Sequence, residues 1–141
     1  MRPRILIITA VFYREVADAL TKGATDALED CDVDTAEVPG ALELPGAITI
    51  AASSGAGYDG YVALGCVIRG ETSHYDYVCG ESARGLMDLS LMGVPVGNGI
   101  LTVENREQAM ERAVKRNKGA AAAHAVLSPI ALRDRFEAAN D

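Results

Sequence analysis

Hydrophobic residues along this chain alternate between short unbroken runs and longer stretches in which they recur at helical spacing. Two such runs, typical of strands buried in a sheet, are Arg4–Thr9 and Tyr61–Ile68. Val33–Val38 predicts a weaker strand, and Val94–Thr102 predicts a strand with two glycines in it. The helical spacing predicts helices over Arg14–Asp30, Pro45–Ser53, Tyr75–Met92, Glu104–Asn117 and Gly119–Ala139. Strands and helices therefore alternate along the whole chain.

This alternation predicts an α/β fold with a parallel sheet and right-handed crossovers. The simplest layout is a flavodoxin-like three-layer sandwich, a four-stranded parallel sheet flanked by helices, in a single domain of residues 1–141. The carboxyl ends of parallel strands share one edge of a sheet, where ligands of this fold class bind. The residues expected to meet at that edge are Phe12, Gly40–Glu43, Gly70–His74 and Asn98.

The stretch Leu64–Asp76 carries the most concentrated chemistry. Its buried run ends at Arg69-Gly70 and is followed by an acid, two hydroxyls and an imidazole, from Glu71 to His74. A helix is predicted to begin just after them, and free N–H groups at a helix N-terminus attract anions. An imidazole titrates near neutrality, which suits proton transfer. This stretch therefore predicts a site that can hold a phosphate and move protons.

Composition excludes several classes of protein. Hydrophobic residues make up 49% of the 141 residues, which argues against disorder, and no apolar run approaches the ~20 residues of a membrane span. The net charge of −7 disfavours nucleic acid as a partner. Three widely spaced cysteines, without a signal-peptide pattern, fit a cytoplasmic protein with reduced thiols. His74 and Asp76 are too few for a metal site, so no metal is expected.

The candidate binding residues each have a structural alternative. Phe12 could stack on a flat ligand or pack in the core, and Glu43 could bind ligand hydroxyls or begin a helix. Arg112 and Lys118 could bind phosphate. Other charged residues surround both of them in the sequence. The local pattern alone therefore favours a solvated helix face over a phosphate site.

The candidate catalytic residues have alternatives as well. His74 could be a general acid and base or a capping residue, whereas His124, in an alanine-rich helix, is expected to be structural. Cys66 could be a nucleophile paired with His74. Its place inside a strand favours a buried, inert thiol instead.

Several segments taken together resemble the lumazine synthase family. They are V-P-G-A-L-E-L-P (Val38–Pro45), G-C-V-I-R-G-E-T-S-H-Y-D-Y (Gly65–Tyr77), G-L-M-D-L-S-L (Gly85–Leu91), and E-Q-A-M-E-R-A (Glu107–Ala113) with N-K-G (Asn117–Gly119). The resemblance covers essentially the whole chain. It implies the flavodoxin-like fold and a transferase that condenses 5-amino-6-(D-ribitylamino)uracil with 3,4-dihydroxy-2-butanone 4-phosphate. The implied product is 6,7-dimethyl-8-ribityllumazine. This condensation is the penultimate step of riboflavin biosynthesis and uses no cofactor or metal.

The resemblance also implies roles for particular residues. The pyrimidine and its ribityl chain would contact Phe12, Ala41, Leu42, Glu43, Cys66, Val67 and Ile68. Glu71 and Thr72 would hold the phosphate of the four-carbon substrate, and His74 would transfer protons. The chemistry needs no enzyme nucleophile, because the substrate amine attacks the substrate ketone.

Three implied site residues remain, and two of them belong to a neighbouring subunit, since the family's unit is a homopentamer whose sites lie between adjacent subunits. Asn98 and Arg112 would come from that neighbour, with Arg112 on the phosphate and Lys118 nearby. Some members pack twelve pentamers into a capsid. In capsid formers a glycine-containing kink precedes N-K-G. Here Val114-Lys115-Arg116 directly joins E-R-A to N-K-G, so this joint is shorter and lacks glycine's freedom at positive φ. We therefore expect a pentamer first, then a decamer, then a capsid.

The chain departs from the family at a few positions. The family commonly has a Ser-Trp pair at the positions of Ala41-Leu42 and a Phe at the position of Asn98. It often has an Asn at the position of Tyr13. Two alternatives to this enzyme remain open. One is a non-catalytic paralogue that binds flavin or lumazine, and the other is a Cys66–His74 hydrolase on the same fold.

Overall fold

The computed structural model of the chain describes residues 2–140 and contains a four-stranded, all-parallel sheet. Its strands are β1 (Arg4–Ala10), β2 (Asp32–Val38), β3 (Gly60–Ile68) and β4 (Val96–Val103). They lie in the order β2-β1-β3-β4, so the chain crosses over from β2 past β1 to β3. The predicted parallel α/β sheet is confirmed, and its order is that of flavodoxin-like folds.

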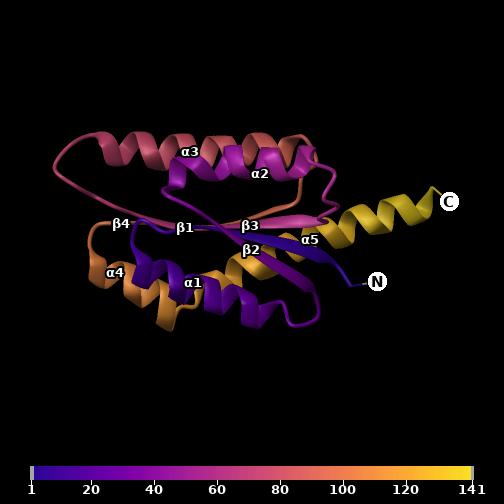
Figure 1. Cartoon of the computed structure of the whole chain (residues 1–141), viewed down its shortest axis with the longest axis horizontal. Coiled ribbons are helices and arrows are strands. Elements are labelled where there is room, and N and C mark those ends of the chain that lie inside the picture. The colour runs from indigo at the N-terminus through magenta and orange to yellow at the C-terminus, as the bar shows by residue number, and fades with distance from the viewer. Residues whose placement is uncertain (1, 141) are drawn as a thin grey trace.

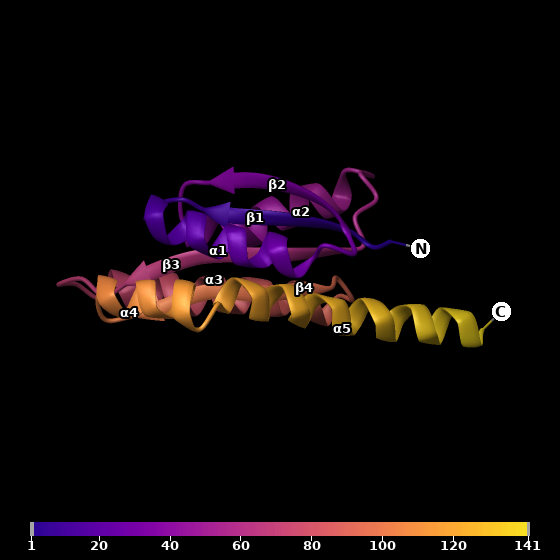
Figure 2. The ribbon, with the colours of Figure 1, turned by 90° about the horizontal axis from the view of Figure 1, so that it is seen from below.

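Helices cover both faces of the sheet (Figure 1). Their bounds are α1 (Arg14–Ala27), the 3₁₀ turn η1 (Ala41–Glu43), α2 (Leu44–Ser53), α3 (His74–Leu91), α4 (Arg106–Met110), the π-helical turn η2 (Glu111–Lys115) and α5 (Lys118–Ala139). One face carries α2 and α3, and the other carries α1, α4 and α5, which gives the predicted three layers. Seen from below, α4 and α5 run along the β4 side and the end of α5 extends past the sheet (Figure 2).

The two central strands are buried on both faces, as their unbroken apolar runs predict. Ile5 and Ile7 of β1 belong to the core that α1 and α5 cover. Leu6 and Ile8 point the other way, into the core beneath α2 and α3. Alternate residues of one strand thus fill two separate cores, which fixes the register of β1 within the sheet.

Two glycines keep β4 close to α5. A Cβ at Gly97 would lie 2.0 Å from the Ala122 carbonyl oxygen, and one at Gly99 would lie 2.9 Å from the Ala122 Cβ. These glycines let the helix pack directly on the strand, so the close approach expected from the sequence is to a neighbouring helix. Asn98 lies between them, opposite Ala63 in the ladder. The expectation that Asn98 meets the other strand exits at the carboxyl edge is therefore wrong, because β4 continues through both glycines to Val103.

Gly97→Ala is expected to lower the free energy of unfolding by at least about 1–3 kcal/mol, because the new methyl group collides with rigid helix backbone. Thermal unfolding of the purified protein measures this. Gly46→Ala is the matched control, since nothing lies within 4 Å of a Cβ at Gly46. Equal thermal midpoints for the two variants would contradict the close packing of α5 on β4.

The predicted helix Glu104–Asn117 is interrupted in the structure. It consists of α4 and η2, and its joint with α5 contains Asn117 at φ 47°, in the left-handed region. Asn117 Oδ1 accepts a hydrogen bond from the backbone N–H of Ala120 over 3.3 Å and so caps α5. Asparagine tolerates this conformation better than most residues. Val114, Lys115 and Arg116 themselves have no positive φ, because the left-handed residue is Asn117, the first of the N-K-G segment. The order pentamer, decamer, capsid therefore stays a prediction.

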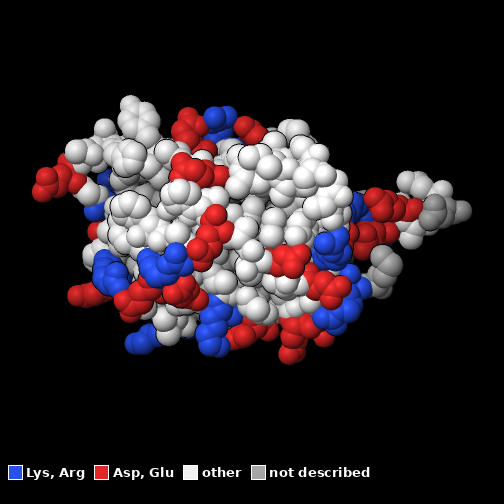
Figure 3. All heavy atoms as spheres, in the orientation of Figure 1, with Lys and Arg blue, Asp and Glu red and all other residues white. Residues whose placement is uncertain are grey.

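Charged side chains of both signs are intermixed on the face shown in Figure 3, most densely along the side where α1 and α4 lie. This face has no large area of single sign. Among the helices of residues 2–140, none is both long enough and apolar enough to cross a bilayer.

Candidate functional site

A pocket of about 370 Å³ opens at the carboxyl edge of the sheet, beside the ends of β1 and β3. This is where the strand order reverses, the usual ligand position in such folds. The predicted site residues that line it are Phe12, Ala41, Leu42, Glu43, Cys66, Val67, Ile68, Thr72 and His74. Glu71 lies on the same loop but does not line the pocket. The structure therefore brings nine of the predicted residues into one cavity.

His74 is the first residue of α3, and its side chain is exposed at the pocket. Its backbone N–H donates to Thr72 Oγ1 over 3.3 Å, which holds the loop before the helix in a tight turn. Within residues 2–140 the imidazole makes no hydrogen bond or ion pair. The ring is thus available to a ligand in the pocket, and α3 sets its position.

The loop after β2 forms the opposite wall. The backbone N–H of Gly40 donates to Glu43 Oε1 over 2.9 Å, so Glu43 stabilises the start of η1 and also lines the pocket. The interpretation of Glu43 as a residue that begins a helix is confirmed. Its second carboxylate oxygen remains for a ligand, so the binding interpretation stays a prediction.

Two large apolar side chains stand at the pocket without being part of the core. Phe12 is 75% exposed and Leu42 is 45% exposed. The core alternative for Phe12 is therefore wrong. An exposed aromatic ring at the wall of a pocket is suited to stacking on a flat ligand.

Cys66 forms part of the pocket floor, but its thiol is buried. Burial raises the pKa of Cys66 to about 11, and the charge of Arg106 opposes this rise without reversing it. A thiol with this pKa stays protonated near neutral pH, whereas thiol hydrolases need a thiolate. The structure therefore favours the inert thiol over the Cys66–His74 nucleophile.

Cys66→Ser is expected to leave kcat/KM within about threefold of wild type, because no step requires a sulfur nucleophile. Steady-state turnover of the wild type and the variant measures this. A loss of a thousandfold or more, in a variant with an unchanged thermal midpoint, would mean that the thiol takes part in the chemistry.

Asn98 and Arg112, which are expected to come from a neighbouring subunit, lie elsewhere, together with Lys118. Asn98, Arg112 and Lys118 line a second pocket of about 340 Å³, between β4, η2 and the start of α5. Arg112 Nη1 donates to the Gln108 carbonyl oxygen over 3.3 Å. Within residues 2–140, neither Arg112 nor Lys118 is paired with a carboxylate. An arginine and a lysine with no acidic partner beside one cavity are suited to an anion.

Sequence reasoning missed part of the first pocket. Tyr13, Tyr75 and Val78 also line it, beside Gly40 and Gly70, which are expected at this edge. Helical spacing could have found Val78, since it lies four residues after His74 on the same helix face. Burial raises the pKa of Tyr13 and of Tyr75. Both hydroxyls therefore stay protonated near neutral pH, and that of Tyr75 lies beside Cys79 and Thr102.

Comparison with known proteins gives a consistent result. Residues 2–134 match the sequence model of a family described as 6,7-dimethyl-8-ribityllumazine synthase. A protein of that name from Bartonella tribocorum is 54% identical over 140 residues, covering 96% of this chain and 93% of the relative. Those from Erythrobacter litoralis and Methylobacterium radiotolerans are 51% and 55% identical, covering 96% and 92% of this chain and 99% and 82% of the relatives.

Proposed function

From the premise that this chain belongs to the 6,7-dimethyl-8-ribityllumazine synthase family, we propose how its residues carry out the condensation. The enzyme is a transferase of riboflavin biosynthesis that joins 5-amino-6-(D-ribitylamino)uracil to 3,4-dihydroxy-2-butanone 4-phosphate. The assignment of residues rests on one observation. The predicted site residues lie in two separate cavities, one that includes His74 and one that includes Arg112.

The first pocket fits the pyrimidine substrate. Phe12 offers a ring for stacking, and the backbone of Cys66, Val67 and Ile68 runs along the floor. The free oxygen of Glu43 is placed to accept hydrogen bonds from ribityl hydroxyls. The phosphate then lies toward the backbone N–H groups of Glu71 and Thr72, just before α3, because the N-terminal end of a helix favours an anion.

The reaction proceeds between the substrates themselves. The pyrimidine amine attacks the ketone to form an imine and release water, and phosphate is then eliminated. The ribitylamino nitrogen then attacks the remaining carbonyl, and ring closure with loss of a second water gives the lumazine. Each step moves protons, and one imidazole can give and accept them. His74 supplies this group, and much of the acceleration comes from holding two substrates together. No cofactor or metal takes part in this scheme.

The second cavity completes the site of an adjacent subunit. Arg112 and Lys118 supply positive charge that the phosphate needs, and Asn98 lies beside them on β4. This arrangement requires a closed ring in which each interface is the same, and we propose a homopentamer. Five chains of 14.8 kDa give a particle of about 74 kDa. Sedimentation at micromolar protein distinguishes it from a decamer, a capsid and a monomer.

A cytoplasmic location belongs to the same proposal. All three cysteines, Cys31, Cys66 and Cys79, are free thiols. Free thiols are typical of proteins that work in a reducing compartment.

The activity itself is tested by mixing both substrates with the purified protein and following the absorbance and fluorescence of the lumazine. Product formation above the uncatalysed rate, with release of one phosphate per lumazine, is the expected result. Tight binding of the lumazine without turnover would identify a non-catalytic binder and overturn the proposal.

A further inference from the structure

Arg69 lies between the strand that leads into the first pocket and the helix that carries His74. Its neighbours Ile68 and Gly70 both line the pocket, whereas Arg69 does not. The backbone N–H of Arg69 donates to the Val103 carbonyl oxygen over 2.9 Å, which extends the β3–β4 ladder by one residue. Its side chain therefore starts from a fixed point of the sheet.

The side chain of Arg69 contacts two further elements at once. Nε donates to Glu104 Oε2 over 2.7 Å, in the turn after β4. Nη1 lies 3.8 Å from Asp76 Oδ1, and the guanidinium carbon lies 4.3 Å from the centroid of the Tyr75 ring. The planar guanidinium can make these contacts together, which an ammonium cannot. Arg69 thus ties the first turn of α3 to the end of β4.

The position of His74 depends on that first turn. The N-cap residue of α3, Ser73, makes no side-chain capping hydrogen bond. Within residues 2–140 no partner holds the imidazole. The helix residues that follow His74 directly are Tyr75 and Asp76, which are the ones that Arg69 contacts.

We propose that Arg69 is a positioning residue for proton transfer, which holds the start of α3 so that the His74 imidazole faces the pocket. This inference rests on the role proposed above for His74. A catalytic group must stay within a narrow range of geometries to work well, and a small displacement slows the reaction. Exposed ion pairs add little to stability. Loss of Arg69 should therefore slow turnover much more than it weakens the fold.

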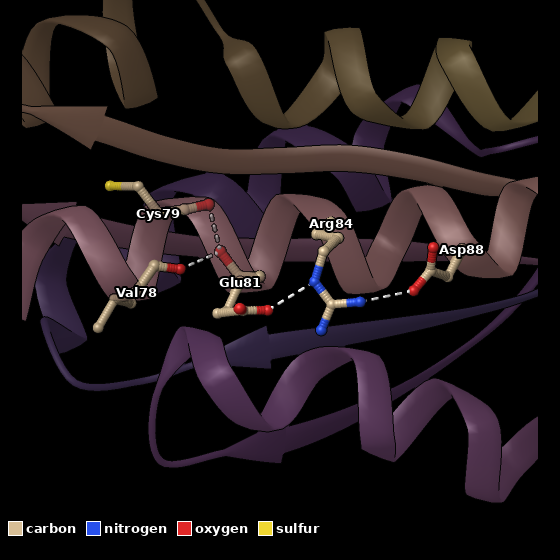
Figure 4. Close-up of polar contacts among 6 residues, drawn as sticks. Val78, Cys79, Glu81, Arg84 and Asp88 are labelled. Atoms are coloured by element: carbon tan, nitrogen blue, oxygen red, sulfur yellow. Dashed lines mark hydrogen bonds and ion pairs between the residues drawn. The ribbon is translucent and has the colours of Figure 1, made fainter.

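Arg69→Ala is the test, and Arg84→Ala is its matched control. Arg84 also bonds two carboxylates, Glu81 over 2.7 Å and Asp88 over 3.0 Å, but within α3 and away from the pocket (Figure 4). We expect Arg69→Ala to lower kcat about five- to tenfold, with both KM values within about twofold. Arg84→Ala should keep the wild-type kcat. The thermal midpoints of the two variants should agree within about 3 °C, because each loses exposed ion pairs.

A double-mutant cycle separates positioning of His74 from a general structural role. In the His74→Ala background, adding Arg69→Ala should lower kcat less than about twofold, because no imidazole remains to be placed. Arg69→Lys should recover only part of the loss, since lysine keeps the charge and loses the planar fork.

Each contrary result has its own meaning. An equal kcat loss in both backgrounds, or a loss confined to KM for the butanone phosphate, would overturn the inference about Arg69 alone. A His74→Ala variant at the wild-type rate would overturn the role of His74 and this inference with it. A wild-type protein that forms no lumazine would overturn the proposed function itself.

Discussion

Arg112→Ala is expected to raise KM for the butanone phosphate about 10- to 100-fold while KM for the pyrimidine changes less than about threefold. A charge-assisted hydrogen bond of arginine to phosphate is worth about 1.5–3 kcal/mol, which corresponds to this range. The half-buried guanidinium lines the second pocket, and its hydrogen bond is to the backbone of Gln108. Its charge is thus not already used by a carboxylate of the described chain. Initial rates with each substrate varied in turn provide the measurement.

Arg116→Ala is the matched control for Arg112→Ala. Arg116 lies at the end of the same π-helical turn, is exposed, and is paired with Glu111 over 3.0 Å, and it does not line the second pocket. Its loss should change neither KM. If Arg112→Ala instead raised both KM values by the same factor, or neither, Arg112 would belong to the solvated helix face that its charged neighbours first indicate.

His74→Ala is expected to lower kcat about ten- to a hundredfold, the low end of general acid–base contributions. The loss stays small because the nucleophile and the electrophile are both substrates, so the pocket still contributes proximity when the imidazole is absent. Single-turnover measurements with saturating substrates report this step without product release.

His124→Ala is the control for His74→Ala. His124 is exposed on α5 and lines neither the first nor the second pocket, so its replacement should leave kcat unchanged. A loss far above a hundredfold in His74→Ala, with both KM values intact, would mean that His74 does more than exchange protons.

The sheet and the first pocket could be predicted from the sequence because they follow from local patterns. The unbroken apolar run of β3 requires burial on both faces, and a parallel sheet then brings the residue groups after β1, β2 and β3 to one edge. Phe12, Glu43 and His74 were found in this way. Glu71 was placed with them, yet its side chain does not line the pocket, because a loop's position after a strand does not fix where each side chain points.

The features that sequence patterns missed depend on packing between distant elements. Asn98 lies inside β4, as the predicted strand Val94–Thr102 has it, but well before the carboxyl end at Val103. The close packing of Gly97 and Gly99 beside it on α5 is not visible in a local pattern. The sequence predicts a helix boundary at Asn117 but not the left-handed backbone there. The close approach of α5 to α1 is likewise a packing feature, since a Cβ at Gly119 would lie 2.1 Å from the Leu20 carbonyl oxygen. The contact of Tyr75 with the pocket depends on how the first turn of α3 is oriented, which no local pattern specifies.

The central claim is that each site takes His74 from one chain and Arg112 from the next. Co-expression of His74→Ala and Arg112→Ala chains tests it most directly, with turnover of the mixed assemblies measured at low butanone phosphate. In randomly mixed rings, about one interface in four joins an intact His74 to an intact Arg112, so activity should rise to about a quarter of wild type. Activity equal to the mean of the two separate variants would contradict a site shared between neighbouring chains.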